Sequence, residues 1–303
     1  MKGFVGVAAG LVMAGHVTMA KQGGPIMAPT AVGSYAMYHC VTRAEVGFGL
    51  VISHTADVRV AIVGSEPRDV ETTVFVQSPD GGSEPAKANI RVDYLWLEFD
   101  VMTDGEKPLK AKVLIAKSAL TALPLTPVED WSPYLHLPES VDSIVVQRGD
   151  DTPKSLPIDK PDLSEIPEWP MISMWLGQFM KMNVEEGDPD TLLVQAGKFD
   201  TRYFTVHANA WLPEIAKAMM GDKVKDVNAR ANASMQVWAT DKVPFGIVKA
   251  TRSLDANFRG PKMKETRHIT ANGAMTLIGF GNDAHSMIMG TPEPIDFDHH
   301  GHM

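Results

Sequence analysis

The sequence has a single cysteine, Cys40, among 303 residues. One thiol excludes an intramolecular disulfide framework and any cysteine-rich zinc or iron–sulfur site. Positive charge is also scarce, because 28 lysines and arginines stand against 37 acidic residues, for a formal net charge of −9. Since a phosphate backbone is bound by clustered basic side chains, this balance argues against nucleic acid as a partner.

Local catalytic motifs are missing as well. Neither Gly-x-Ser-x-Gly nor His-Glu-x-x-His occurs in the sequence. Single histidines are scattered through the chain, so a hydrolase assembled in space stays an alternative. We expect a protein that is not an enzyme and has no resident cofactor.

The N-terminus has the layout of a secretory signal. Lys2 precedes an apolar run, and Thr18-Met19-Ala20 supplies small residues at a cleavage point. No later stretch reaches the roughly 18 apolar residues that a membrane-spanning helix needs. The sequence therefore predicts an exported protein of the periplasm or cell envelope, with no membrane span once the signal is removed. An uncleaved N-terminal anchor is the alternative.

Most of the remaining chain has the alternation of β-strands. The clearest segment is 90–101, where Ile90, Val92 and Tyr94 share one face and polar or aliphatic residues share the other. Segment 58–63 is expected to end at Gly64. Further segments typical of strands are 71–77, 110–115, 143–148, 172–184, a hairpin over 192–206, 233–239, 246–252, 265–270 and 274–280.

One helix is expected in the second half. Asn209 is a suitable N-cap, apolar residues follow at i, i+3 and i+4 spacing, and Gly221 is a suitable end. Prolines are dense between residues 121 and 170, where regular structure is not expected to run far.

These patterns divide the chain into five parts. They are a signal peptide at 1–20, a β-rich half at 21–148, a proline-rich linker or strap at 149–170, a second β-sheet half at 171–290 and a histidine-rich flexible tail at 291–303.

Three segments of the second half form an ordered series. Segment 194–203 has a glycine turn between strands, 237–249 joins a tryptophan-bearing strand to a Pro-Gly turn, and 277–288 is a glycine-interrupted strand. Over about residues 170–290 this series resembles the LolA/LolB-like exported bacterial proteins, including uncharacterised periplasmic relatives. The resemblance implies a mainly β (α+β) fold: a strongly curved antiparallel sheet or half-barrel with one or two helices on its concave side. It also implies an apolar cavity, since the best-known members carry the acyl chains of lipoproteins.

The first functional hypothesis is therefore an exported binding protein that holds an acyl chain or another apolar ligand, a lipid or small molecule. Plain core packing is the alternative role for its large apolar residues. The residues expected to line the cavity are Trp175, Phe179, Trp211, Met219, Met220, Trp238 and Phe245.

Two other functions are also considered: metal binding by the C-terminal tail, and a structural role that involves no small ligand. Imidazoles and carboxylates gather in the tail, where they suit copper or zinc, although a frayed terminus is the alternative. The predicted metal ligands are Asp296, Asp298, His299, His300 and His302. The third hypothesis is a structural or assembly component of the cell envelope, which would bind another envelope protein through an exposed sheet edge or apolar patch.

Overall fold

A computed structural model describes residues 26–46, 51–77, 83–123, 125, 140–156, 180–211, 228–259 and 266–294. These residues are mainly β-strand, which confirms the predicted mainly β class. The helices expected on the concave side are not shown. The one helix in the described ranges, α2 (Lys117–Thr121), is five residues long.

The strands form one 13-stranded sheet, in which β8 (Asp190–Val194) pairs with β9 beside the main path. Along that path the order is β13 (Glu293–Pro294), β6 (Lys154–Leu156), β5 (Val141–Arg148), β4 (Leu109–Ala116), β3 (Ser83–Thr103), β2 (Val51–Gln77), β1 (Tyr35–Val46), β12 (Arg267–Gly281), β11 (Ile247–Arg259), β10 (Asn228–Ala239), β9 (Gly197–Trp211) and β7 (Met180–Glu186). Only the short β13–β6 pair is parallel, so the sheet is mixed, and its two ends do not pair with each other.

Strand β1 joins the early and late parts of the chain into this one sheet. Tyr35 pairs with Ala61 of β2 on one side and with Gly281 of β12 on the other. On each side of this junction the neighbouring strands are antiparallel, apart from the short β13–β6 pair. The two halves therefore share hydrogen-bonded strands.

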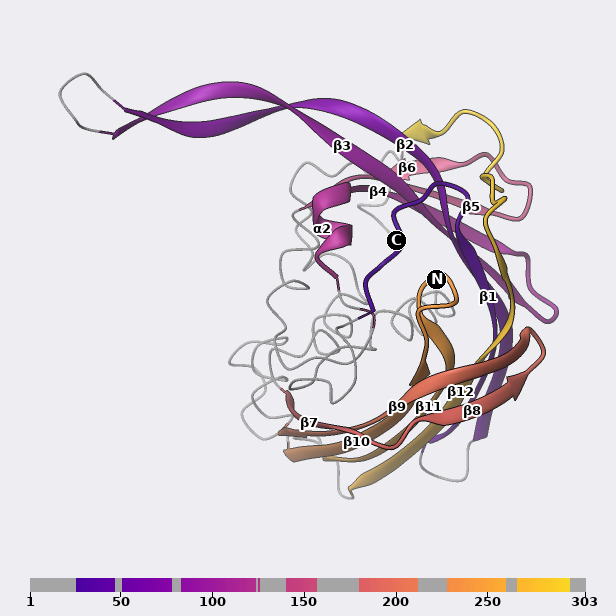
Figure 1. The fold of residues 1–303 in the computed structure, drawn as a ribbon. Coiled ribbons are helices and arrows are strands. Elements are labelled where there is room, and N and C mark those ends of the chain that lie inside the picture. The colour runs from indigo at the N-terminus through magenta and orange to yellow at the C-terminus, as the bar shows by residue number, and fades with distance from the viewer. Residues whose placement is uncertain are drawn as a thin grey trace, which may run out of the picture.

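The sheet is strongly bent, as Figure 1 shows. Its inner face carries the main core cluster, which includes Tyr38, Val58 and Leu277, each at most 1% exposed. Because side chains alternate along a strand, Arg59, which lies between Val58 and Val60, projects from the opposite, outer face. We use the terms inner face and outer face in this sense below.

Two sequence-based boundaries are wrong. Strand β2 does not end at Gly64 but continues to Gln77, with an irregular register between Ile62 and Gly64. A glycine inside a strand commonly marks such a bulge, and here the Trp96 ring lies 3.5 Å from where a Cβ of Gly64 would stand.

The second error is the start of the expected helix. Asn209 and Trp211 belong to β9, where Asn209 pairs with Asn232 and Trp211 with Arg230 of β10. Asn209 suits an N-cap by residue type alone, but the neighbouring strand β10 supplies hydrogen-bond partners that extend β9 through it. Residues 212–221 lie outside the described residues.

The hairpin formed by β2 and β3 extends far beyond the rest of the sheet. Strand β1 pairs with β2 only as far as Ala61, and β4 pairs with β3 only from Tyr94 onward. Residues 63–77 and 83–93 therefore pair only with each other among the described residues. Figure 1 shows this two-stranded segment, here called the ribbon, projecting from one end of the sheet.

Candidate functional site

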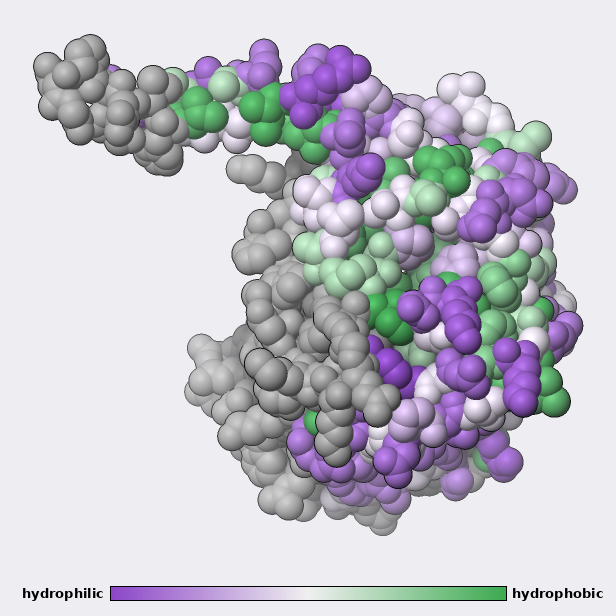
Figure 2. Space-filling view, in the orientation of Figure 1, coloured by the Kyte–Doolittle hydropathy of each residue, from purple (hydrophilic) through white to green (hydrophobic). Residues whose placement is uncertain are grey.

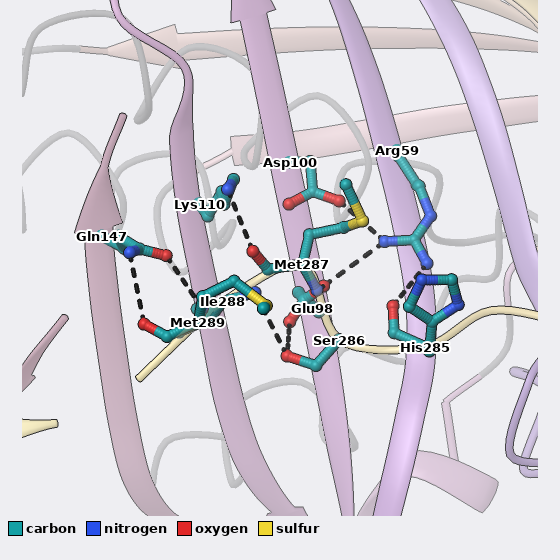
Figure 3. A network of polar contacts seen from close by, with 10 residues as sticks. All are labelled: Arg59, Glu98, Asp100, Lys110, Gln147, His285, Ser286, Met287, Ile288 and Met289. Atoms are coloured by element: carbon teal, nitrogen blue, oxygen red, sulfur yellow. Dashed lines mark hydrogen bonds and ion pairs between the residues drawn. The ribbon is translucent and has the colours of Figure 1, made fainter. Parts of the chain in front are cut away.

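The most extensive polar network lies on the outer face, beneath the segment that follows β12. This segment, residues 282–294, is here called the strap, and from here on the word does not refer to the proline-rich segment 149–170. It crosses β2, β3, β4 and β5, and its last residues pair with β6 (Figure 1). Figure 3 shows how outer-face side chains contact the strap.

Three of these side chains bind the middle of the strap. The Arg59 guanidinium donates to the carbonyl oxygen of His285 at 3.0 Å. Glu98 accepts from the Ser286 hydroxyl at 2.6 Å and from the Met287 backbone N–H at 2.8 Å. The Lys110 ammonium donates to the Met287 carbonyl oxygen at 2.9 Å (Figure 3).

The far end of the strap is bound by its backbone as well. The Gln147 amide accepts from the Met289 N–H at 3.2 Å and donates to the Met289 carbonyl oxygen at 3.4 Å. Beyond this point Lys154 pairs with Glu293 at 2.6 Å. Most of these contacts involve backbone groups of the strap, so they set its path across the sheet without depending on its side chains.

The near end of the strap is held against Gly33. The Ala284 N–H donates to the Gly33 carbonyl oxygen at 2.8 Å. Gly33 has φ +96°, and a Cβ built there would lie 2.4 Å from the Asn282 carbonyl oxygen. Only glycine fits this close approach without strain.

Charge is concentrated under the strap. The Glu98 side chain is fully buried, and Arg59 contacts it at 3.3 Å and contacts Asp100 at 2.7 Å. Burial raises the pKa of Asp100, and the neighbouring Glu98 adds to this, while the hydrogen bond from Arg59 opposes both. The Asp100 Oδ1 atom has no hydrogen-bond partner. The chemistry of this network is that of a buried ion-paired anchor for a peptide segment.

Sequence reasoning did not identify this network. Glu98 and Asp100 alternate with Leu97 and Phe99 in a strand, and two acids at such spacing indicate a polar outer face. Their partners Ser286 and Met287 are 188 and 189 residues away from Glu98, so no local pattern connects them.

Two of the predicted ligand-binding side chains, those of Trp238 and Phe245, lie in the described part of the chain, and they are apart. Phe245 is 5% exposed and belongs to the core cluster with Val237. Trp238, the next residue after Val237, projects from the outer face, where its indole N–H donates to Asp190 at 3.1 Å and its ring lies 5.0 Å from that of Tyr203. Trp238 and Phe245 therefore do not line one cavity.

The side chains of the other predicted site residues lie outside the described part of the chain. Trp211 lies at the end of β9, but its side chain is not described, and Trp175, Phe179, Met219 and Met220 fall outside the described residues. The predicted metal ligands Asp296, Asp298, His299, His300 and His302 also fall outside them. Within the described ranges no group of three His, Cys, Asp or Glu residues is placed to hold a metal ion.

Residues outside the strands also contribute to the core cluster on the inner face. Ala28, Leu120 and Leu123 are buried in the core cluster, and the Ala28 N–H donates to the Leu123 carbonyl oxygen at 3.1 Å. These residues therefore cover part of the inner face with the protein's own side chains.

One part of the inner face is polar. The Arg252 guanidinium donates to the Thr42 hydroxyl at 3.3 Å, and burial lowers the pKa of Arg252. Burial raises the pKa of Cys40 to about 11 and also raises that of Tyr38. The Tyr38 hydroxyl is buried without a hydrogen-bond partner. An unpaired buried hydroxyl is uncommon and calls for an explanation.

Beyond Arg68 the ribbon has one mainly apolar face. Val70 pairs with Ile90, Thr72 with Ala88 and Val74 with Ala86, so all six project from the same side. The opposite side carries Glu71 and Lys87, which form an ion pair at 2.6 Å. Ile90 is 44% exposed. Figure 2 shows apolar residues along the ribbon beside hydrophilic ones.

Comparison with known proteins identifies no family. No family model matches the chain, and no curated protein matches it. One similar solved structure is an exported protein, provisionally so described, with a YmcC-like fold from Bacteroides fragilis NCTC 9343. It is 9% identical, covers 85% of this chain and 100% of its own, and has a TM-score of 0.29. Another is a provisionally described lipoprotein from Parabacteroides distasonis ATCC 8503, at 10% identity, 86% and 100% coverage and a TM-score of 0.26.

TM-scores this low carry no argument about the fold or function of this chain. The resemblance to LolA/LolB-like proteins is not among these findings and stays a prediction. No helix in the described ranges is long and apolar enough to cross a bilayer.

Proposed function

We propose that the protein is an exported, non-enzymatic structural or assembly component of the cell envelope, which binds another envelope protein through its ribbon. The signal-like pattern of residues 1–20 supports export. The observation that carries the binding role is the ribbon of residues 63–77 and 83–93, which projects from the sheet with one apolar face.

The physical argument is that an isolated pair of strands is marginally stable in water. The ribbon has no third strand along either edge among the described residues, so its edge N–H and C=O groups are available to another strand. Its apolar face carries Val70, Val74 and Ile90. A partner that adds an extended segment along an edge and covers this face stabilises the ribbon and gains main-chain hydrogen bonds.

The occupant that fits is therefore a strand of another envelope protein, with alternating apolar and polar residues. Hydrogen bonds along the edge would supply affinity, and the apolar face would set which side chains of the added strand point inward. The ion pair of Glu71 and Lys87 keeps the other face soluble.

Binding of an acyl chain or other apolar ligand is the second candidate. It is favoured by the unpaired Tyr38 hydroxyl and by the guanidinium of Arg252 on the inner face, which could meet the polar end of an amphiphile. Against it, Leu120 and Leu123 are buried in the core cluster and cover part of the inner face. Metal binding by the tail residues 296–302 is a further proposal that rests on the sequence alone.

The test is photocrosslinking in cells from a probe residue placed at Ile90, with a matched probe at Asn89. These positions are adjacent in β3 but lie on opposite faces of the ribbon. We expect a crosslink from position 90 and none from position 89, and mass spectrometry should map it to an extended segment of one envelope protein.

Three outcomes would overturn the proposal. They are equal crosslinking from both positions, no crosslink from either, and a product formed only by two copies of this chain. A lipid extracted in stoichiometric amount from the purified protein would instead favour the second candidate.

A further inference from the structure

The strap presents a row of soft metal ligands to solvent. His285 is exposed, Met287 is 42% exposed and Met289 is 70% exposed, whereas Ile288 is 7% exposed. Ser286 and Ile288 alternate with these three residues in the sequence. The Ser286 hydroxyl donates to the buried Glu98. The imidazole and the two thioethers therefore share the side of the strap that faces away from the sheet.

The geometry points to a Cu(I) site formed by His285, Met287 and Met289, with Met287 as the central ligand. Thioether sulfur is a soft ligand that favours Cu(I) over harder ions, and imidazole nitrogen also binds copper. In extended chain, side chains two residues apart start about 7 Å from each other. The unbranched methionine side chain is flexible enough to bring its sulfur close to a neighbouring ligand across this spacing.

The backbone of this row is held in place before any metal binds. The carbonyl oxygens of all three residues accept hydrogen bonds, from Arg59, Lys110 and Gln147. The N–H groups of Met287 and Met289 also donate to sheet side chains, to Glu98 and Gln147. A ligand set held by supporting hydrogen bonds loses less conformational freedom when it binds.

A metal site would account for the exposure of methionine side chains on the strap. Met289 exposes most of its side chain on a segment whose backbone is tightly bound, and exposed thioethers gain nothing from burial there. Because two of the three proposed ligands are thioethers, the expected preference is for the soft ion. This site is distinct from the predicted tail site at 296–302 and independent of the ribbon.

The experiment uses the full chain with His299→Ala, His300→Ala and His302→Ala, which removes the tail imidazoles as competing ligands. Cu(I) is titrated anaerobically against a chromogenic Cu(I) chelator. Binding of one Cu(I) is expected, with an affinity that falls at least tenfold in Met287→Leu and less in Met289→Leu. Zn(II) should not compete.

Met102→Leu is the matched control, because Met102 is 43% exposed and lies outside the strap. It should leave the Cu(I) affinity unchanged. Met287→His, which keeps a Cu(I) ligand at the central position, should restore most of the affinity lost in Met287→Leu. X-ray absorption of the bound copper should show sulfur ligation.

The proposal is overturned if the tail-substituted protein binds no Cu(I), or if Met287→Leu and Met102→Leu reduce the affinity equally. Copper ligated by nitrogen and oxygen alone, or displaced by Zn(II), would overturn it as well. Circular dichroism of each variant separates loss of a ligand from loss of folding.

Discussion

Substitution of Glu98 tests whether the strap is bound through a buried anchor. In Glu98→Ala the Ser286 hydroxyl and the Met287 N–H lose their acceptor, and Arg59 loses one of its two carboxylate partners. Since the Glu98 side chain is fully buried, water does not replace these contacts readily. Removing one partner of a buried ion pair costs about 3–5 kcal/mol, and we expect a loss in the free energy of unfolding of this size.

Glu98→Gln separates charge from shape. The Gln side chain retains an oxygen that can accept from Met287, but it removes the negative charge opposite Arg59. The expected loss is about 1–3 kcal/mol, smaller than for Glu98→Ala. Glu106→Ala is the control, because Glu106 is exposed in the turn after β3, and surface changes of this kind stay within about 0.5 kcal/mol.

Urea unfolding gives the free energies, and hydrogen exchange reports the strap directly. The amides of Met287 and Met289 should exchange faster in Glu98→Ala than in the wild type, while those of the core strands change in proportion to global stability. A loss below about 1 kcal/mol, with the strap amides still protected, would refute the anchoring role of Glu98.

Two further predictions concern buried titratable groups. Burial raises the pKa of Asp100, so the folded protein holds the proton of the Asp100 carboxyl group more tightly than the unfolded chain does. The stability that results is present at low pH and is lost as pH rises through the raised pKa. In urea titrations the free energy of unfolding of the wild type minus that of Asp100→Asn should therefore fall as pH rises above 3.8, the ordinary pKa of the group. A rise would show that the ion pair with Arg59 dominates. Because burial raises the pKa of Cys40 to about 11, its thiolate is scarce near pH 8, and alkylation by iodoacetamide should be roughly a hundredfold slower in the folded protein than in urea; equal rates would contradict this.

Local patterns predicted the strand content well but not the strand lengths. The alternation over 90–101 lies inside β3, and the hairpin over 192–206 is confirmed by the pairing of Val194 with Gly197. Segments 58–63 and 71–77, however, are parts of the single strand β2, because the ladder continues past a bulge at Gly64, where the first strand was expected to end. Asn209 shows the same limit, since β10 determines that it extends a strand.

The composition and residue pattern by themselves determined the class of the protein: a β-rich chain with a signal-like N-terminus and little capacity for disulfides or nucleic acid. Alternation is a local property, so it can be read without knowing which strands meet. Only the tertiary structure decided that β1 pairs with β12, that Trp238 and Phe245 lie on opposite faces, and that Glu98 binds the strap. Those outcomes depend on contacts between residues far apart in the chain, whose partners no local spacing specifies.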